Sequence, residues 1–403
     1  MDAYVARQPI LDKKKKIYAY ELLFRDGTAN YVPDIDGDTA TSTLLSNSFF
    51  TIGMETVIGG RKAFINFTEN LIVRGIPLLL PQDKVVVEIL EDVKPVDSVI
   101  EACRQLSQKG YQLALDDFDY HPEYQPLIDL ADIIKFDFRL TPLDQIETYL
   151  QKLPGNGIRY LAEKVETYEE FQIAKEMGFE LFQGYFFHKP EIVHGKKVQG
   201  SQIQLLQIMS EINKPEFDFK ELDNLISRDV TISYKLLKYI NSAFFATANR
   251  ISSIRQALVY LGEKEIRRFI SLVAMTELAT DKPSELIRSC CIRGKFCELV
   301  GSAQGASGDA SELFTLGMFS LIDAILDQPM DQIMDQLPLN QNLRTALAKR
   351  TGPLVPFLLL AESYERGDWV AVTECAAQIE VTEKELPPLY TQACQWANMV
   401  DRL

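Results

Sequence analysis

The sequence predicts a modified (β/α) barrel followed by an all-helical domain, an α/β fold joined to an all-α fold. About eight short apolar stretches alternate with helical segments in the first 190 residues, and seven of them carry polar residues at or near their C-terminal ends. Strand patterns are nearly absent after residue 200. Strands that alternate with helices form parallel sheets through right-handed crossovers. In a barrel of this kind, the functional site lies at the C-terminal strand ends.

The barrel pattern begins with two strand-like stretches, residues 4–10 and 17–25. The four lysines 13–16 between them are typical of a solvated turn. A hairpin makes its two strands antiparallel, so we expect the first strand to run against its neighbour, unlike a regular barrel. The later strand-like stretches are residues 63–67, 85–90, 113–118, 133–138, 160–165 and 181–187.

Helical segments separate the later strands. Apolar residues recur at helical spacing in residues 95–109, 141–153 and 167–177. The run Val85-Val86-Val87 is typical of a strand that is covered on both faces. Both patterns fit a parallel sheet surrounded by helices.

Polar residues at the strand ends predict one shared site. An unpaired charge in a buried strand is costly, so a series of such charges is expected to converge. The alternative, that each charge is separately paired or exposed, fits a whole series poorly. These residues are Glu21, Asn66, Glu88, Asp116, Asp117, Lys135, Asp137, Glu163 and Gln183.

Oxygen donors dominate this set, and they are the ligands that Mg²⁺ or Mn²⁺ prefers. The adjacent Asp116 and Asp117 allow one carboxylate to bridge two metals about 3.5–4 Å apart, as in two-metal phosphodiester hydrolysis. Lys135 would orient a water or neutralise a phosphate oxygen. The residues therefore predict metal-dependent chemistry on a phosphate ester.

Composition limits the class of protein. A chain of 403 residues predicts two or three domains. It has no apolar run long enough for a membrane span and no signal-peptide layout, and its six cysteines lack CxxC spacing, so we expect a cytoplasmic protein with reduced thiols. A net charge of −15 argues against binding to nucleic-acid polymers, but not against a small anion held by metals.

Helix signals dominate the second half. We expect a barrel domain at residues 1–193, a linker at 194–201 and a helical domain at 202–403. Ser253 is a predicted N-cap and Gly262 a predicted C-terminal helix stop. Trp369 and Trp396 are interpreted as core residues rather than interface anchors.

Eight motifs occur in a fixed order over residues 1–190. They are Gln8-Pro9-Ile10, Glu21-Leu22-Leu23-Phe24-Arg25, Asn66-Phe67-Thr68, Glu88-Ile89-Leu90-Glu91, Asp116-Asp117-Phe118, Lys135-Phe136-Asp137, Ala162-Glu163-Lys164-Val165-Glu166-Thr167 and Gln183-Gly184-Tyr185. This order resembles the EAL-domain family, bacterial phosphodiesterases that open cyclic di-GMP to linear pGpG. The resemblance implies a modified TIM barrel.

The resemblance also implies roles. One Mg²⁺ or Mn²⁺ would be held by Glu21, Asn66, Glu88 and Asp116, and a second by Asp116, Asp117 and Glu163. Catalytic residues would be Glu21, Lys135, which contacts the nucleophilic water, Glu163, and Gln183, which supports the site. Ligand-binding residues would be Arg25, which binds a phosphate, and Asp137. Glu91 would brace the loop after Asp117.

Two departures from the family pattern affect the site. Residues 119–124 replace a Gly-rich, Ser-containing loop that packs at the family's dimer interface. Lys164 stands where the family has Gly, and it would either reach into the site as a cation or point to solvent; we prefer solvent. His121, in the altered loop, is interpreted as a surface residue rather than a metal ligand.

The second half resembles the HDOD domain, a helical module related to HD phosphohydrolases. The resemblance rests on Asp229-Val230-Thr231 and on residues 235–244 and 251–262, with the best match over 202–275. The chain has only three histidines, 121, 188 and 194, so a His-Asp metal centre in this half is impossible. We expect this half to be non-catalytic and to bind a protein partner.

Two functions remain open at this point. One is a cyclic di-GMP phosphodiesterase with a helical regulatory domain, which the retained ligand set favours. The other is a degenerate receptor or scaffold without turnover, which the altered loop favours. A homodimer is possible, and the short linker predicts that the helical domain packs against the barrel.

Overall fold

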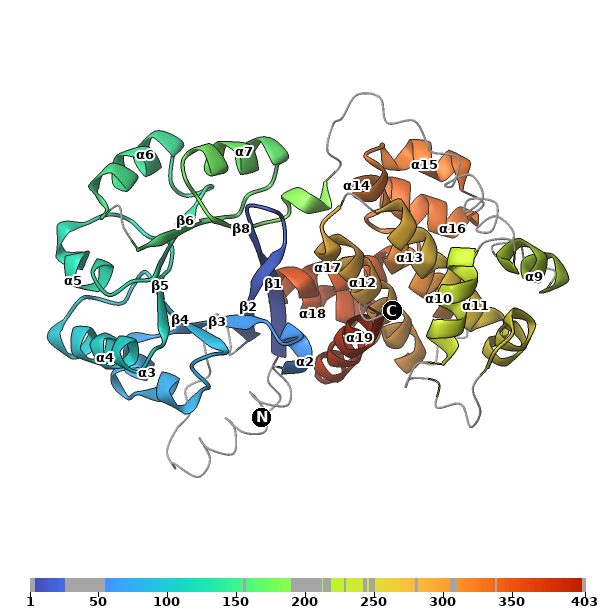
Figure 1. Cartoon of the computed structure of the whole chain (residues 1–403), viewed down its shortest axis with the longest axis horizontal. Helices are drawn as coiled ribbons and strands as arrows, with labels where there is room; N and C mark the ends of the chain where they lie inside the picture. Colours follow the sequence, from blue (N-terminus) through green and yellow to red (C-terminus); the bar gives the residue numbers. More distant parts are fainter. Residues whose placement is uncertain are drawn as a thin grey trace. The chain divides into compact units, whose positions relative to one another are not determined.

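The chain divides into two compact units, residues 1–187 with 363–369 and residues 188–362 with 370–403. Figure 1 shows strands and helices in the first unit and helices in the second. The computed structural model describes residues 4–25, 55–154, 157–189, 212, 219–227, 230–241, 245, 251–279, 282–304, 310–337 and 339–400. The predicted linker 194–201 and His194 lie outside these residues, and the boundaries of the two domains stay predictions.

Eight strands form a closed barrel in the order β1 to β8. β1 is antiparallel to both β2 and β8, and the remaining neighbours are parallel. The hairpin predicted at the lysine run is therefore confirmed. The strands are β1 Tyr4–Asp12, β2 Ile17–Arg25, β3 Lys62–Phe67, β4 Val85–Ile89, β5 Gln112–Leu115, β6 Ile133–Asp137, β7 Arg159–Glu163 and β8 Leu181–Gln183.

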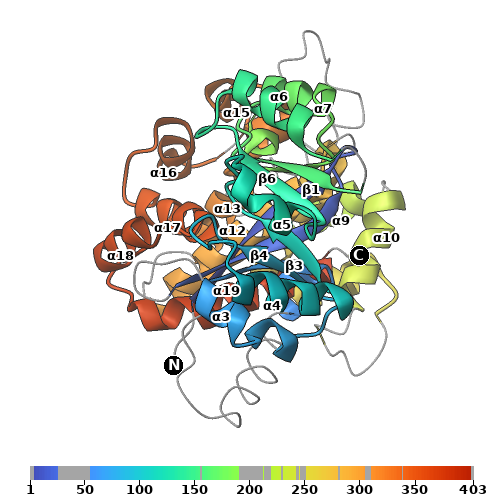
Figure 2. The same ribbon diagram turned by 90° about the vertical axis from the view of Figure 1, so that its left-hand side faces the viewer.

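Helices connect the parallel strands and lie outside the barrel, as Figures 1 and 2 show. They include α4, α6 and α7, close to the three helices that the sequence predicts. Thr167 starts α7 with a capping box, in which it accepts from Glu170 N and Glu170 reaches back to its backbone. The α-helices of this region are α2 Glu55–Ile58, α3 Glu69–Val73, α4 Asp97–Gln108, α5 Gln125–Ile128, α6 Leu143–Lys152 and α7 Tyr168–Glu176, with short 3₁₀ helices at Ile76–Leu79, Pro122–Tyr124 and Phe186–His188.

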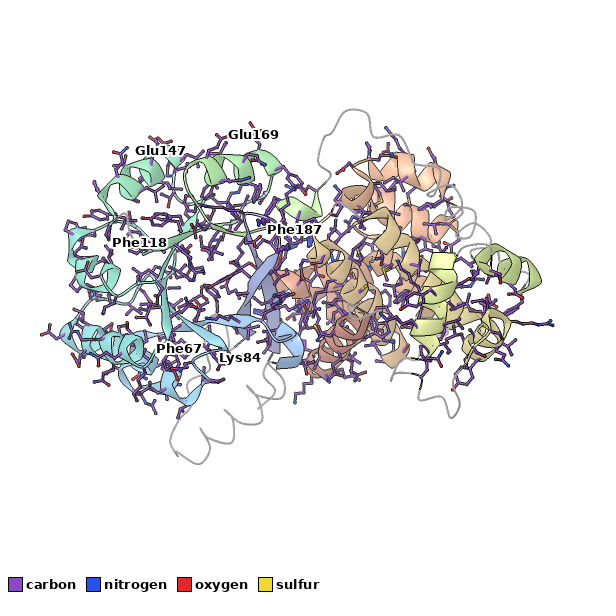
Figure 3. All side chains as sticks on the ribbon, viewed as in Figure 1. Phe67, Lys84, Phe118, Glu147, Glu169 and Phe187 are labelled. Carbon is purple, nitrogen blue, oxygen red and sulfur yellow. The ribbon has the colours of Figure 1, made fainter. Side chains whose placement is uncertain are left out.

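The barrel interior is filled by one apolar residue from each strand. All eight are at most 2% exposed, so they close the barrel with a dry layer. They are Ile10, Ala19, Phe64, Val86, Ala114, Ile133, Leu161 and Leu181. Figure 3 shows the opposite case on the outer helices, where Glu147 of α6 and Glu169 of α7 point away from the strands and are exposed.

The last predicted strand is shorter than expected. β8 ends at Gln183, and residues 186–188 form a 3₁₀ helix instead. Gly184 has a φ of 145°, and a Cβ built there would lie 2.1 Å from the carbonyl oxygen of Val165. The backbone therefore turns where only glycine fits, which ends the strand.

The second unit is helical, and none of its described residues form a strand. Ser253 caps α11 by accepting from Gln256 N at 3.2 Å, and Gly262 interrupts the helix with a non-helical φ of 68°. Both predictions are confirmed. The α-helices are α9 Phe219–Ser227, α10 Val230–Ile240, α11 Ile254–Leu278, α12 Ser284–Ala303, α13 Ala310–Phe319, α14 Ile322–Leu326, α15 Met330–Gln336, α16 Gln341–Arg344, α17 Val355–Arg366, α18 Trp369–Gln378 and α19 Leu386–Val400, with a π-helical segment at Thr345–Lys349 and a 3₁₀ turn at Glu383–Glu385.

Three of the sequence-based predictions concern the cysteines, the two tryptophans and membrane spans. All six cysteines are free and buried, and the predicted reducing environment stays a prediction. Trp396 is 4% exposed and packs edge-on against Phe314, whereas Trp369 is only partly buried. None of the helices in the described part of the chain is long and apolar enough to cross a membrane.

Candidate functional site

The polar residues lie directly above the apolar layer of the barrel. On each strand from β2 to β8, the residue two positions after the layer residue is polar. Side chains two apart on a strand share a face, so all seven point into the barrel mouth. They are Glu21, Asn66, Glu88, Asp116, Lys135, Glu163 and Gln183. The structure therefore brings together the predicted strand-end residues.

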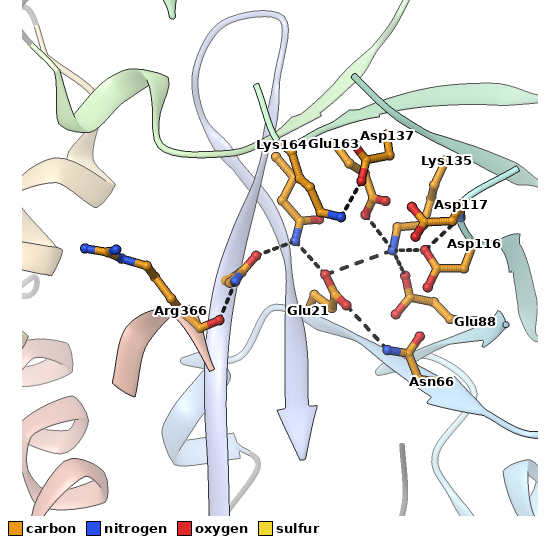
Figure 4. A network of polar contacts seen from close by, with 12 residues as sticks. Glu21, Asn66, Glu88, Asp116, Asp117, Lys135, Asp137, Glu163, Lys164 and Arg366 are labelled. Carbon is orange, nitrogen blue, oxygen red and sulfur yellow. Dashed lines mark hydrogen bonds and ion pairs between the residues drawn. The ribbon is translucent and has the colours of Figure 1, made fainter. Parts of the chain in front are cut away.

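Lys135 occupies the centre of this group (Figure 4). Its Nζ lies 2.5 Å from Glu88 Oε1, 2.6 Å from Glu163 Oε1 and 2.7 Å from Asp116 Oδ1. Glu21 Oε2 is farther away, at 4.0 Å. The Lys135 side chain is 1% exposed, so the carboxylates are its electrostatic partners in place of water.

Gln183 connects Glu21 to β1. Its Nε2 donates to Glu21 Oε2 at 2.5 Å and to Gln8 Oε1 at 2.9 Å. Asn66 Nδ2 donates to the other oxygen, Glu21 Oε1, at 3.5 Å. Glu21 is thus oriented by two amides from opposite sides.

Gln8 is a site residue to which the sequence reasoning assigned no role. It pairs in register with Glu21, and it lies two residues before Ile10, the β1 member of the apolar layer. Because β1 runs antiparallel to β2, its mouth end is its N-terminal end. The motif Gln8-Pro9-Ile10 could have revealed this role. On an antiparallel strand, the polar residue that faces the mouth comes two positions before the apolar layer residue, whereas on the other strands it comes two positions after it.

Asp116 and Asp117 follow β5, and Glu163 ends β7. Among the described residues, these three carboxylates form the one group of three or more potential metal ligands, with one ligand atom from each within 4.8 Å of the others. Asp117 has a φ of 38°, and its N–H donates to Asp116 Oδ1 at 3.1 Å. This left-handed bend turns the second carboxylate back toward the first.

Burial changes the protonation equilibria of the site. Burial raises the pKa of Glu88 and of Glu163 well above the usual range, although Lys135 opposes the shift in both cases. Burial, and then the charge of Asp116, raise the pKa of Asp117. Burial would lower the pKa of Lys135, but the surrounding carboxylates raise it well above its ordinary value.

Several buried oxygens at the mouth fit a divalent cation. Asn66 Oδ1, Glu88 Oε2 and Gln183 Oε1 have no hydrogen-bond donor among the described residues. Unsatisfied buried acceptors are costly, and a hard cation is a partner that satisfies them. The donor set is all oxygen, which matches the predicted Mg²⁺ or Mn²⁺ chemistry. The individual metal-binding and catalytic roles stay predictions.

The altered loop, residues 119–124, is held by α6 of the same barrel. Tyr149 OH donates to Asp119 Oδ1, and the Tyr120 ring lies 6.0 Å from the Tyr149 ring. Lys152 Nζ lies 5.0 Å above the Tyr120 ring. His121 is exposed and pairs with Glu123 at 3.3 Å, as expected for a surface histidine. The bulky residues of this loop therefore give it an intramolecular anchor.

The prediction that Lys164 points to solvent is confirmed for the exposure of its side chain but not for its ammonium group. Its Nζ forms an ion pair with Asp137 Oδ2 at the barrel mouth, although 56% of the side chain is exposed. The Oδ1 atom of Asp137 accepts from the backbone N–H groups of Arg139 at 2.6 Å and Leu140 at 3.1 Å. Asp137 is therefore fully engaged by local donors, and its role in ligand binding stays a prediction.

The predicted roles of two further residues, Arg25 and Glu91, stay predictions. Arg25 ends β2, but its side chain lies outside the described residues. Glu91 follows β4 and is exposed, so its bracing of the loop after Asp117 stays a prediction.

Family models match both halves of this chain, and two relatives match it over nearly its whole length. The EAL domain family model matches residues 61–190, and the HDOD domain family model matches residues 203–332. Cyclic di-GMP phosphodiesterase CdgJ of Vibrio cholerae is 38% identical over 403 residues, covering 99% of this chain and 93% of that protein. The chain belongs to the EAL–HDOD family. Protein YuxH of Bacillus subtilis, an uncharacterized protein, is 36% identical over 410 residues and is matched over its full length.

Two solved structures resemble parts of this EAL–HDOD protein. The calcium and cyclic di-GMP complex of Klebsiella pneumoniae BlrP1 is 24% identical, with a TM-score of 0.37, and the match covers 46% of this chain and 55% of that chain. An EAL domain protein from Listeria monocytogenes EGD-e is also 24% identical, with a TM-score of 0.34, and the match covers 46% of this chain and 87% of that one.

Proposed function

We propose that this EAL–HDOD protein is a metal-dependent phosphodiesterase that opens cyclic di-GMP to linear pGpG. The observation that carries the proposal is the ring of polar residues on β2–β8, directly above one apolar layer. This ring holds five of the predicted oxygen ligands and a lysine at the same height of the barrel, an arrangement that a site without catalytic use does not need. The relationship to CdgJ of Vibrio cholerae supports the substrate.

The carboxylates and Asn66 would be the ligands of two cations. Glu21, Asn66, Glu88 and Asp116 would hold one Mg²⁺ or Mn²⁺, and Asp116, Asp117 and Glu163 a second. When bound, these cations supply an activated water and neutralise negative charge on the phosphate. Gln183 and Asn66 fix the carboxylate of Glu21 through the hydrogen bonds described above.

Lys135 is suited to hold the attacking water. Its ammonium has three donors, and in the structure they face Glu88, Asp116 and Glu163. Cations bound to these carboxylates would release a donor for the water. In the reaction, the water oxygen forms a new bond to phosphorus while one phosphorus–oxygen ester bond breaks. The released 3′ oxygen takes a proton, and the product is a linear dinucleotide with a 5′ phosphate.

The direct test is turnover of cyclic di-GMP by the full chain. We expect linear pGpG to accumulate with Mg²⁺ or Mn²⁺, and turnover to stop with excess EDTA. Chromatography of the nucleotides measures both. Binding of cyclic di-GMP without any turnover over hours at millimolar Mn²⁺ would contradict the proposal.

The altered loop supports one alternative, a receptor or scaffold that binds cyclic di-GMP without turnover. Residues 119–124 lack the glycines of the family loop, although α6 holds them in place. Equilibrium binding measured beside turnover distinguishes the two functions. A receptor would bind the nucleotide and leave it cyclic.

The helical unit would regulate the barrel or bind a protein partner. It contains no histidine after residue 194, so a His-Asp metal centre has no ligands there. Its packing against the barrel, its partner and a homodimer stay predictions. Deleting residues 200–403 and measuring nucleotide affinity and turnover tests whether this half influences the barrel.

A further inference from the structure

Lys164 has a backbone conformation that is unusual for a lysine. It follows the last residue of β7, and its φ is 53°, in the left-handed region. A residue with a Cβ loses about 1–2 kcal/mol in this conformation, whereas glycine does not. The chain keeps the bend and still carries a long cationic side chain. The backbone conformation alone would favour glycine, so the presence of a lysine side chain at this position needs an explanation.

The Lys164 ammonium is fixed at the barrel mouth rather than free in solvent. Its partner, Asp137, is 1% exposed and is itself held by two backbone N–H groups. Long cationic side chains ordinarily bury their stem and keep the charge in water. Here more than half of the side chain is exposed, while the charge is directed inward to a buried carboxylate (Figure 4).

The position of this charge matters because of its neighbours. Asp137 pairs in register with Glu163, the residue before Lys164. Partial burial would lower the pKa of Lys164, but Asp137, and then Asp117 and Glu163, raise it above its ordinary value. Asp117 and Glu163 belong to the Asp116–Asp117–Glu163 group, the carboxylates that would hold the second cation. A fixed positive charge beside such a group opposes the binding of another cation.

We propose that Lys164 lowers the affinity of the Asp116–Asp117–Glu163 group for a divalent cation. The protein would then bind one cation more tightly than the other, and the supply of Mg²⁺ or Mn²⁺ would set the occupancy of the second site. This inference rests on the proposed function, because it assumes that these carboxylates hold metal. Lys164 acts through its charge and does not itself ligate the cation.

Mn²⁺ titration of the full chain tests the inference without any nucleotide. Calorimetry and electron paramagnetic resonance of free Mn²⁺ measure the binding. In Lys164→Met, we expect the weaker phase to tighten roughly three- to tenfold, because one positive charge is removed. Lys164→Arg keeps the charge and should resemble the wild type. Arg139→Met is the matched control, since Arg139 is 43% exposed and pairs with Glu170 at 2.8 Å.

A second variant separates the effect of the charge from any loss of folding stability. Lys164→Gly removes the charge and suits the left-handed backbone, so it should tighten Mn²⁺ binding to the same degree while raising the melting temperature. Unchanged or weaker binding in both Lys164→Met and Lys164→Gly overturns the inference and leaves the proposed function standing. No Mn²⁺ binding by the wild type or either variant overturns both.

Discussion

Lys135 Nζ lies 2.5 Å from Glu88 Oε1, and the two side chains are 1% and 0% exposed. They come from β6 and β4, which are separated by β5 in the barrel. The pair therefore spans the mouth and joins strands that share no hydrogen bonds. Buried charges of this kind are stable only as a set, because each alone would be costly to remove from water.

Removing the central ammonium should destabilise the barrel. Lys135→Met leaves Glu88, Asp116 and Glu163 without their common partner, and we expect the free energy of unfolding to fall by about 3–5 kcal/mol. Mn²⁺ should restore part of the loss, since it binds the same carboxylates. Urea unfolding with and without Mn²⁺ measures both. The control is Lys175→Met, at an exposed position of α7; similar small losses in both variants would contradict the prediction.

A neutral side chain at position 88 should separate stability from metal binding. Burial already raises the pKa of Glu88 well above its usual range, so an amide of the same shape is compatible with the site. We expect Glu88→Gln to keep or raise the free energy of unfolding by about 1 kcal/mol without divalent cations. Mn²⁺ affinity should fall at least about tenfold, because a charged ligand is lost. A clear loss of stability together with unchanged Mn²⁺ affinity would argue against this account.

Glu21 should be required for turnover but not for folding. Glu21→Ala removes a proposed metal ligand at the rim of the mouth, and we expect at least about a 100-fold loss of turnover. Circular dichroism should show an unchanged fold, because the apolar layer beneath Glu21 is intact. Nucleotide binding should weaken as well. Glu147→Ala, on the exposed face of α6, should retain wild-type activity.

The altered loop should depend on Tyr149. Tyr149→Phe removes the donor to Asp119, and we expect the free energy of unfolding to fall by about 0.5–1.5 kcal/mol. Because Asp119 lies two residues from Asp117, Mn²⁺ affinity should fall too. Gln145→Ala is the control, since Gln145 donates to the same hydroxyl but does not contact the loop. Equal effects of the two variants on Mn²⁺ binding would show that the loop contact has no special role.

Divalent cations should stabilise the protein more as the pH rises. The pKa values of Glu88 and Glu163 are raised in the folded state, so in the absence of metal their stabilising contribution is complete below the ordinary pKa of about 4.5. It is lost as the pH rises through the folded-state values. The raised pKa of Lys135 adds no change in this range, because its ordinary value is 10.5.

Cations bind the ionised carboxylates, so the stabilisation that Mn²⁺ adds increases with pH, whereas the contribution of the protonated carboxyl groups decreases. The rise in melting temperature caused by Mn²⁺ should therefore increase between pH 5 and pH 8. Glu88→Gln should flatten this dependence, because one of the raised groups no longer titrates. Differential scanning fluorimetry at several pH values measures the trend. A Mn²⁺ effect that is constant over this range in the wild type would contradict the assignment.

The sequence by itself determined the strands of the barrel and most of its site. Polar residues such as Glu21, Glu88 and Lys135 interrupt apolar strands, and this pattern is local, so it can be read along the chain. The period of two in a strand then places each polar residue on the same face as the apolar residue two positions before it. Parallel strands bring these positions to one end of the barrel.

Only the tertiary structure decided which groups meet. Gln8 joins the site because β1 runs in the opposite direction, and Lys164 turns inward because Asp137 of another strand is held in place to receive it. Tyr149 anchors the altered loop from a helix 30 residues away in sequence. These contacts depend on closure of the barrel and on the direction of individual bonds. Strand and helix periodicity carries no information about either, because it describes neighbours along the chain and not across it.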